Sequence, residues 1–77
     1  MVQITGVTNA NDIKAGHFAY ISKANNVLNM PLNSTQGYLY CFGLENGYRV
    51  QFYMEYSGTP YCIRNYIFDA WGNWKEL

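Results

Sequence analysis

Hydrophobic and polar residues alternate along the second half of the 77-residue chain, and this period of two predicts β-strands. The alternating segments are residues 37–43 (GYLYCFG), 48–56 (YRVQFYMEY) and 60–68 (PYCIRNYIF). Turn-forming residues separate them: Glu45-Asn46-Gly47 follows the first segment, and Ser57-Gly58-Thr59-Pro60 follows the second. Because Asn-Gly between alternating runs is a strong hairpin signal, we expect the three segments to form an antiparallel meander.

Shorter patterns extend this sheet at both ends. Residues 17–22 (HFAYIS) predict a further strand from their aromatic and β-branched content, and the N-terminal VQIT predicts a first strand or an arm. Asn11 is expected to cap one helical turn that ends at Gly16. The last residues, NWKEL, are expected to form a short strand that pairs back onto the sheet. The predicted fold is therefore mainly β: a small antiparallel sheet domain, a meander of hairpins, with at most one short helical turn near residues 10–15.

Residues 23–36 (KANNVLNMPLNSTQ) are predicted to form one long loop. The segment is rich in asparagine and contains a proline, and loops of this length are usually functional or mobile. Asn33-Ser34-Thr35 matches a glycosylation sequon, which we interpret as a chance match because the N-terminus carries no pattern of a secretory signal.

The two turns predict a register for the three central strands. Centring the hairpins on Asn46-Gly47 and on Gly58-Thr59 pairs Cys41 with Phe52 and Cys62 with Glu55. One face is then apolar and forms the expected core: Leu39, Cys41, Val50, Phe52, Met54, Ile63 and Ile67. The opposite face is aromatic and polar: Tyr38, Tyr40, Phe42, Gln51, Tyr53, Glu55, Arg64 and Tyr66. The two cysteines point to opposite faces in this register, so we expect no disulfide between them.

The composition indicates one small domain with little charge. Five basic and five acidic residues give a formal net charge of zero, which argues against nucleic-acid binding. Charged residues make up only 13% of the chain, so its eight tyrosines and its asparagines must supply much of the polar surface. Apolar runs are too short to span a bilayer, so no membrane insertion is expected. Because the cysteines and the single histidine have no metal-ligand spacing, we expect no metal site and no cofactor.

The chain ends in the motif Trp-x-x-Trp-Lys-x-Leu, carried by Trp71, Trp74, Lys75 and Leu77. Upstream of it come an Asp-containing turn before Gly and an aromatic strand. A Gly-x-Leu strand, a Val-Gln strand and a Tyr-x-x-Arg strand follow. The residues that carry these motifs are Asp12, Gly16, Phe18, Tyr20, Gly37, Leu39, Arg49, Val50, Gln51 and Arg64. In this order the motifs resemble the pyocin-knob-like domain of phage tail fibres and R-type pyocin fibres, over residues 10–77.

The resemblance implies a non-enzymatic receptor-binding module of a phage tail fibre that contacts a bacterial cell-surface glycan. Residues 1–9 would then be an N-terminal arm or strand leading from a fibre, and residues 10–77 the knob-like β domain. The implied place is the virion, at a tail fibre or spike assembled in the host cytoplasm. The expected partners are a bacterial surface carbohydrate and further copies of the chain in a homotrimer, which would also help so short a chain to fold.

The candidate ligand-binding residues combine rings that can stack on sugars with groups that form directional hydrogen bonds. They are Gln51, Tyr53, Arg64, Tyr66, Trp71 and Trp74. The same aromatic-polar face could instead be covered by the rest of the chain or form a trimer interface, since interfaces are also rich in Tyr, Trp and Arg. The alternative function is a structural or trimerisation module of a fibre or virion protein, with no ligand of its own.

Simpler interpretations apply to several of these residues. A cation–π contact between Arg64 and Tyr53 would explain the arginine without a ligand, and Gln51 is interpreted as a satisfied glutamine of the sheet. His17 is accompanied by no nucleophile motif, and the acidic residues are scattered along the chain. We therefore expect no enzymatic activity.

Overall fold

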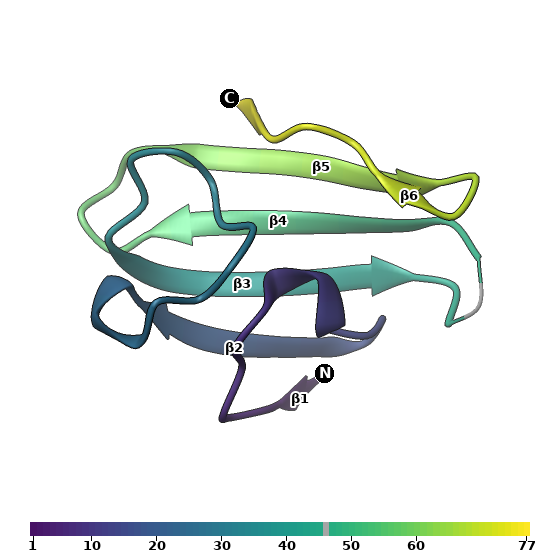
Figure 1. Cartoon of the computed structure of the whole chain (residues 1–77), viewed down its shortest axis with the longest axis horizontal. Helices are drawn as coiled ribbons and strands as arrows, with labels where there is room; N and C mark the ends of the chain where they lie inside the picture. Colours follow the sequence, from purple (N-terminus) through teal and green to yellow (C-terminus); the bar gives the residue numbers. More distant parts are fainter. Residues whose placement is uncertain (46) are drawn as a thin grey trace.

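The computed structural model describes residues 1–45 and 47–77, which form one open sheet dominated by antiparallel pairs (Figure 1). Within this part of the chain the sheet has seven strands in the order β1-β2-β3-β4-β5-β6, and β7 also pairs with β5. Only the β1–β2 pair is parallel among these pairings. The strands are β1 (Val2–Gln3), β2 (His17–Ser22), β3 (Gln36–Gly43), β4 (Arg49–Glu55), β5 (Tyr61–Ile67), β6 (Ala70–Trp71) and β7 (Lys75–Glu76). The predicted mainly β fold class is confirmed, as is the pairing of the closing segment with the sheet.

The described residues also form two single turns of 3-10 helix, η1 (Ala10–Asp12) and η2 (Lys23–Asn25). The cap of η1 is Asn9, whose side chain accepts a hydrogen bond from the Asn11 backbone N–H at 2.9 Å, so the prediction of Asn11 as the cap is wrong. The single turn expected near residues 10–15 is η1, and η2 is a second one. Ser22 caps η2 through its side chain, and Asn26 ends the turn with a left-handed φ of 53°. No helix in the described part of the chain has the length and hydropathy needed to cross a membrane.

The register between β3 and β4 differs from the predicted one by one residue. Cys41 lies opposite Gln51, and Leu39 lies opposite Tyr53. Beyond the strand ends, the Leu44 backbone N–H donates a hydrogen bond to the Tyr48 carbonyl at 2.9 Å. The connection between the two strands is therefore longer than a two-residue turn. Asn46, on which the predicted turn was centred, lies outside the described residues. Because successive side chains of a strand point to opposite faces, the one-residue shift exchanges the faces of β4 relative to β3.

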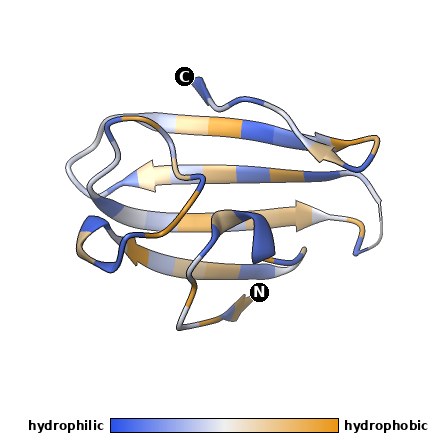
Figure 2. Cartoon of the chain, in the orientation of Figure 1, coloured by the Kyte–Doolittle hydropathy of each residue, from blue (hydrophilic) through white to orange (hydrophobic). Residues whose placement is uncertain are grey.

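The buried face of the sheet therefore carries residues of the predicted aromatic-polar face, and the predicted core face is wrong for β4 and β5. The core consists of Ala10, Ile13, Ala19, Ile21, Leu39, Cys41, Tyr53 and Cys62, and three polar residues are buried beside it: Gln51, Glu55 and Arg64. Along β4, Gln51, Tyr53 and Glu55 are the buried residues. Figure 2 shows how hydrophilic and hydrophobic residues alternate along the strands. The β4–β5 register differs from the predicted one by two residues, with Met54 opposite Tyr61, so these two strands keep their expected relative faces.

One side of the sheet is covered by the connecting segments. Both η1 and the segment between η2 and β3 pass in front of the strands in Figure 1. Ala10 and Ile13, in the connection between β1 and β2, are part of the core. Val27 and Met30, in the connection between β2 and β3, pack against it. The C-terminal tryptophans, Trp71 and Trp74, close the same side near β5.

Cys41 and Cys62 are both buried. They are also free, as predicted, but the predicted reason is wrong. They point to the same face, because Cys41 lies opposite Gln51 and Cys62 opposite Tyr53. Strand β4 lies between them, and two inter-strand spacings amount to roughly 9–10 Å. That separation exceeds the Cα distance of about 7 Å beyond which a disulfide cannot close.

Candidate functional site

A tight turn after β5 brings the C-terminal tryptophans back towards the sheet. The turn residues Phe68 and Asp69 both have left-handed backbones, with φ of 54° and 61°. Two successive residues with positive φ are typical of a type I′ hairpin, for which Asn-Gly or Asp-Gly is the usual sequence signal. Phe-Asp carries no such signal, so this hairpin was not predicted. It places Trp71 opposite Tyr66, with the ring centroids 5.1 Å apart in an edge-to-face arrangement.

Arg64 lies between the two tryptophans. Its guanidinium carbon is 4.3 Å from the ring centroid of Trp71 and 4.6 Å from that of Trp74. Its Nε donates to Gln51 Oε1 at 2.8 Å, and its Nη2 donates to Asn11 Oδ1 at 2.8 Å. All four of these partners are uncharged, although the side chain is only 6% exposed. Burial lowers the pKa of Arg64 to about 10, so the buried group is still a cation at neutral pH.

Gln51 positions this arginine from inside the core. The glutamine is fully buried, and its Nε2 donates to the Ala10 carbonyl at 2.6 Å while its Oε1 accepts from Arg64. Its interpretation as a satisfied sheet glutamine is confirmed. Gln51 cannot touch a ligand from this position, and its burial agrees with the alternative that the rest of the chain covers this face.

Tyr53 also belongs to the core. It is fully buried opposite Leu39 and Cys62, and its hydroxyl donates to Glu55 Oε1 at 2.8 Å. Burial, followed by the hydrogen bond to Glu55, raises the pKa of the Tyr53 phenol. The predicted contact between Tyr53 and Arg64 is wrong, because Arg64 lies opposite Gln51 in the observed register.

Arg49 extends the stack of cations and rings. Its guanidinium carbon is 4.2 Å from the ring centroid of Tyr66 and 5.4 Å from that of Trp71. Its Nε is buried without a hydrogen-bond partner, and an unsatisfied buried donor costs roughly 1–3 kcal/mol. The faces of the two rings offset part of this cost, since cation–π contacts contribute about 0.5–2 kcal/mol.

Asparagines connect the tryptophans to the long loop and to η1. The indole Nε1 of Trp74 donates to the Asn29 carbonyl at 2.8 Å, and Asn29 Nδ2 donates to Asn9 Oδ1 at 2.9 Å. Asn29 has a left-handed φ of 62°, which asparagine tolerates better than most residues. The C-terminal segment, the long loop and η1 therefore meet at one place, beside Arg64.

These residues surround a shallow hollow of about 490 Å³, which we call the tryptophan hollow. Its lining consists of Asn11, Asn29, Met30, Arg64, Tyr66, Asp69, Ala70, Trp71, Gly72, Asn73 and Trp74. Four of the six residues predicted from the sequence to bind a ligand are brought together here: Arg64, Tyr66, Trp71 and Trp74. The prediction missed the polar rim, of which Asn11, Asn29, Asp69 and Asn73 are part. The only sequence signal for it was the high asparagine content of the chain.

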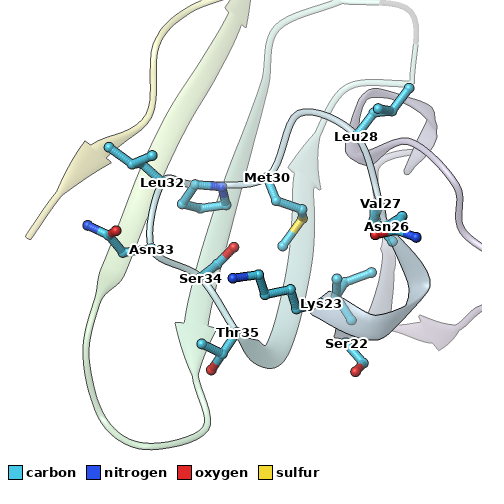
Figure 3. Close-up of a pocket in the computed structure, with 12 residues that line it drawn as sticks. Ser22, Lys23, Asn26, Val27, Leu28, Met30, Leu32, Asn33, Ser34 and Thr35 are labelled. Carbon is cyan, nitrogen blue, oxygen red and sulfur yellow. The ribbon is translucent and has the colours of Figure 1, made fainter.

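A second hollow, of about 560 Å³, lies under the segment between β2 and β3 (Figure 3). Lys23 extends across it towards Ser34, and Met30 and Val27 form part of its apolar wall. Among the described residues that line it there is no aromatic ring and only one charged side chain. The tryptophan hollow combines more kinds of binding group, and for this reason we take it as the candidate site.

The tryptophan hollow combines apolar and polar surface. It offers ring surfaces, amides, one carboxylate at Asp69 and the edge of a buried guanidinium. In the described residues no group of three histidine, cysteine, aspartate or glutamate side chains is placed to hold a metal ion. Comparisons with protein-family models, with curated proteins and with solved structures found no match to this chain.

Proposed function

We propose that the chain is a non-enzymatic receptor-binding module of a phage tail fibre, and that the tryptophan hollow contacts a bacterial cell-surface glycan. The observation that supports it most is the grouping of Trp71, Trp74 and Tyr66 with exposed amide and carboxylate groups around one shallow concavity. The resemblance of the Trp71–Leu77 ending to pyocin-knob-like domains supports the same proposal.

A hollow of this composition suits a sugar because a pyranose has two kinds of surface. Its C–H faces pack on aromatic rings, and its hydroxyls exchange hydrogen bonds with amides and carboxylates. Asp69 and Asn73 are exposed at the rim, where they are free to meet such hydroxyls. The buried Arg64 adds a positive charge without a carboxylate among its four contacts, which favours a glycan that carries acidic groups.

The proposed assembly is a homotrimer. A single shallow site is expected to bind weakly, near the millimolar end of the affinity scale. Three linked sites that engage one cell surface together would raise the apparent affinity by roughly 10²–10⁴.

The test is the substitution Asn73→Ala, which removes an exposed amide of the hollow and leaves the stack around Arg64 in place. We expect it to weaken binding to the polysaccharide bound best on an array of bacterial surface polysaccharides. Loss of one direct hydrogen bond corresponds to a decrease of roughly three- to tenfold per site. The matched control is Asn25→Ala in η2, an exposed asparagine outside the hollow, which should bind like the wild type.

Tyr53→Ala is unsuitable as a ligand-binding variant, because it opens a cavity in the core and its effect would report on stability. An array without reproducible binding, from a folded and assembled protein, would contradict the proposal. Equal binding by Asn73→Ala and the wild type would show that the glycan contact lies outside the tryptophan hollow.

The second candidate function is a structural fibre module with no ligand. The contacts of Arg64 and Trp74 favour it, since they hold the C-terminal segment, the long loop and η1 together without any ligand. A blank array combined with an intact oligomer would support this second function.

A further inference from the structure

The side of the sheet opposite the core carries a continuous set of large apolar side chains. The strand registers place Tyr40 between Phe18 and Phe52, and Tyr38 between Tyr20 and Met54. We call this surface the aromatic face; it consists of Phe18, Tyr20, Tyr38, Tyr40, Phe42, Val50, Phe52, Met54, Tyr61 and Ile63. In the described chain, η1 and the long loop cross the opposite side of the sheet and leave this one open (Figure 1).

Half of the aromatic face is strongly exposed. Tyr20 is 43% exposed, Tyr38 40%, Phe42 46%, and Met54 and Tyr61 38% each. With roughly 150–250 Å² for each large side chain, these five residues alone present about 400 Å². The five half-buried members add to this area. The largest apolar patch of a typical monomer is about 300–600 Å², and such patches are often interaction sites.

The core on the other side of the sheet is small by comparison. Its eight buried apolar residues include two alanines and two cysteines, and it shares its space with Gln51, Glu55 and Arg64. The chain thus places more large aromatic side chains on the aromatic face than in its own core. Burying the aromatic face would add about 25 cal/mol for each Å² removed from water. For a chain of this length, such a gain is comparable with the whole stability of a small domain.

The rings of the aromatic face are held in contact before any partner arrives. Tyr40 stacks on Phe18 with centroids 5.4 Å apart and on Phe42 at 6.2 Å. Tyr20 and Tyr38 meet edge to face at 5.6 Å, and the Tyr20 hydroxyl donates to Gln36 Oε1 at 2.6 Å. Side chains that are already ordered lose little entropy when they are buried against a partner.

The charge pattern of the aromatic face favours a second copy of the chain as its partner. None of the ten residues of the aromatic face is charged, so two copies can place the same surface against itself without like-charge repulsion. Polar residues lie at its margins: Gln3 opposite Phe18, Gln36 opposite Ser22, and Lys75 opposite Ile63. An apolar centre with a polar rim is the usual anatomy of a protein interface.

We propose that the aromatic face binds a second copy of this chain in a two-fold pair, so that the two sheets pack face to face. This contact joins two copies and is separate from the contacts of the proposed homotrimer. Together with its rim, the face approaches the roughly 800 Å² per partner of a standard stable interface. Packed sheets lie about 10 Å apart, with their side chains interdigitating, and the exposed tyrosine and phenylalanine rings fill that space. The inference concerns a surface distinct from the tryptophan hollow and does not rest on glycan binding.

Sedimentation equilibrium of the whole chain and of Phe42→Lys tests the proposal. We expect the wild type to be an oligomer at micromolar concentration, and the lysine to raise the dissociation constant at least tenfold by placing a charge in the contact. The matched control is Phe68→Lys, which makes the same replacement at an 85% exposed turn position outside the aromatic face. This control should assemble like the wild type.

A wild type that stays monomeric up to about 1 mM would overturn the proposal, as would equal dissociation constants for Phe42→Lys and Phe68→Lys. Far-UV circular dichroism establishes whether Phe42→Lys keeps the β-sheet. If it does not, Tyr38→Lys replaces it, at an exposed position in the middle of β3.

Acetylation of tyrosines in the wild type gives a readout that needs no variant. Tyr38 and Tyr61 should be protected at high protein concentration and modified on dilution, whereas Tyr56, 74% exposed beyond the end of β4, should react under both conditions. Unchanged reactivity of Tyr38 across concentrations would overturn the proposal. Glycan binding by a monomer, lost in Phe42→Lys, would make the aromatic face a ligand surface. It would overturn this inference and also the assignment of the glycan contact to the tryptophan hollow.

Discussion

Gln51 connects three parts of the molecule through one side chain. It sits in the middle of β4, accepts from Arg64 on β5 and donates to Ala10 in η1. Because it is fully buried, neither of its partners can turn to water if the amide is removed. A polar residue in the core of this small sheet is therefore a structural link between η1 and the tryptophan hollow.

At the residue scale, Gln51→Met is expected to lower the free energy of unfolding by about 2–4 kcal/mol, because it leaves the Arg64 Nε and the Ala10 carbonyl unpaired in the core. Urea unfolding at one fixed protein concentration measures this. Gln3→Met, the same replacement at an exposed position of β1, should change the free energy by less than about 0.5 kcal/mol. Equal stabilities of the two variants would show that Gln51 does not link these parts.

The long loop is held at the end of β4 by a carboxylate. Glu55 is 4% exposed and accepts hydrogen bonds from the Thr35 backbone and hydroxyl, the Gln36 N–H and the Tyr53 hydroxyl. Burial by itself would raise the pKa of Glu55, but the hydrogen bonds from Thr35, Tyr53 and Gln36 outweigh it and hold the pKa below its ordinary value. Glu55 therefore connects the end of the long loop with β3 and β4. We call it the acidic anchor of the long loop.

At the element scale, this anchor predicts a pH dependence of stability. Since the folded-state pKa of Glu55 is depressed, its contribution is complete above the unfolded value near pH 4.3 and is lost as the pH falls through the folded pKa. Glu55→Gln should be less stable than the wild type at pH 7 by about 1–3 kcal/mol. Its unfolding free energy should also fall less steeply between pH 5 and pH 3.

Urea unfolding across this pH range measures both effects. Glu45→Gln is the control, because Glu45 is exposed in the loop between β3 and β4. A Glu55→Gln variant with the same pH profile as Glu45→Gln would contradict the role of Glu55 as an anchor.

Over the whole molecule, the two sides of the sheet have opposite characters. The covered side holds the buried polar residues Gln51, Glu55 and Arg64 among the apolar residues of the core. The uncovered side holds the stacked rings of the aromatic face. If the hydrophobic stabilisation of this chain depends on a second copy, its stability cannot be separated from protein concentration.

At the scale of the whole molecule, we expect the thermal midpoint to rise with protein concentration. For a dimer that unfolds as it dissociates, tenfold dilution should lower the midpoint by roughly 3–6 °C in a domain of this size. Calorimetry over a hundredfold range of concentration measures the shift. A midpoint independent of concentration would agree with a stable monomer and contradict the assembly.

The strand positions could be predicted from the sequence because their signals are local. Residues 17–22 match β2, and the segments 37–43, 48–56 and 60–68 match β3, β4 and β5 to within a residue or two. Alternation and turn residues act over a few positions, so they are visible in the chain itself. Four residues of the candidate site were predicted because tryptophan, tyrosine and arginine cluster near the C-terminus.

Only the tertiary structure decided which side of the sheet is the core. The choice depends on the β3–β4 register, in which Gly43 lies opposite Arg49. This register differs by one position from that of a two-residue turn at 46–47. Apolar pattern favoured Phe52 and Met54 as core residues, but η1 and the long loop cover the other side, where Ala10 and Arg64 satisfy the amide of Gln51. These partners are up to 41 positions apart in the chain, so no local pattern could reveal them. For the same physical reason, the tryptophan hollow exists only once distant segments have met.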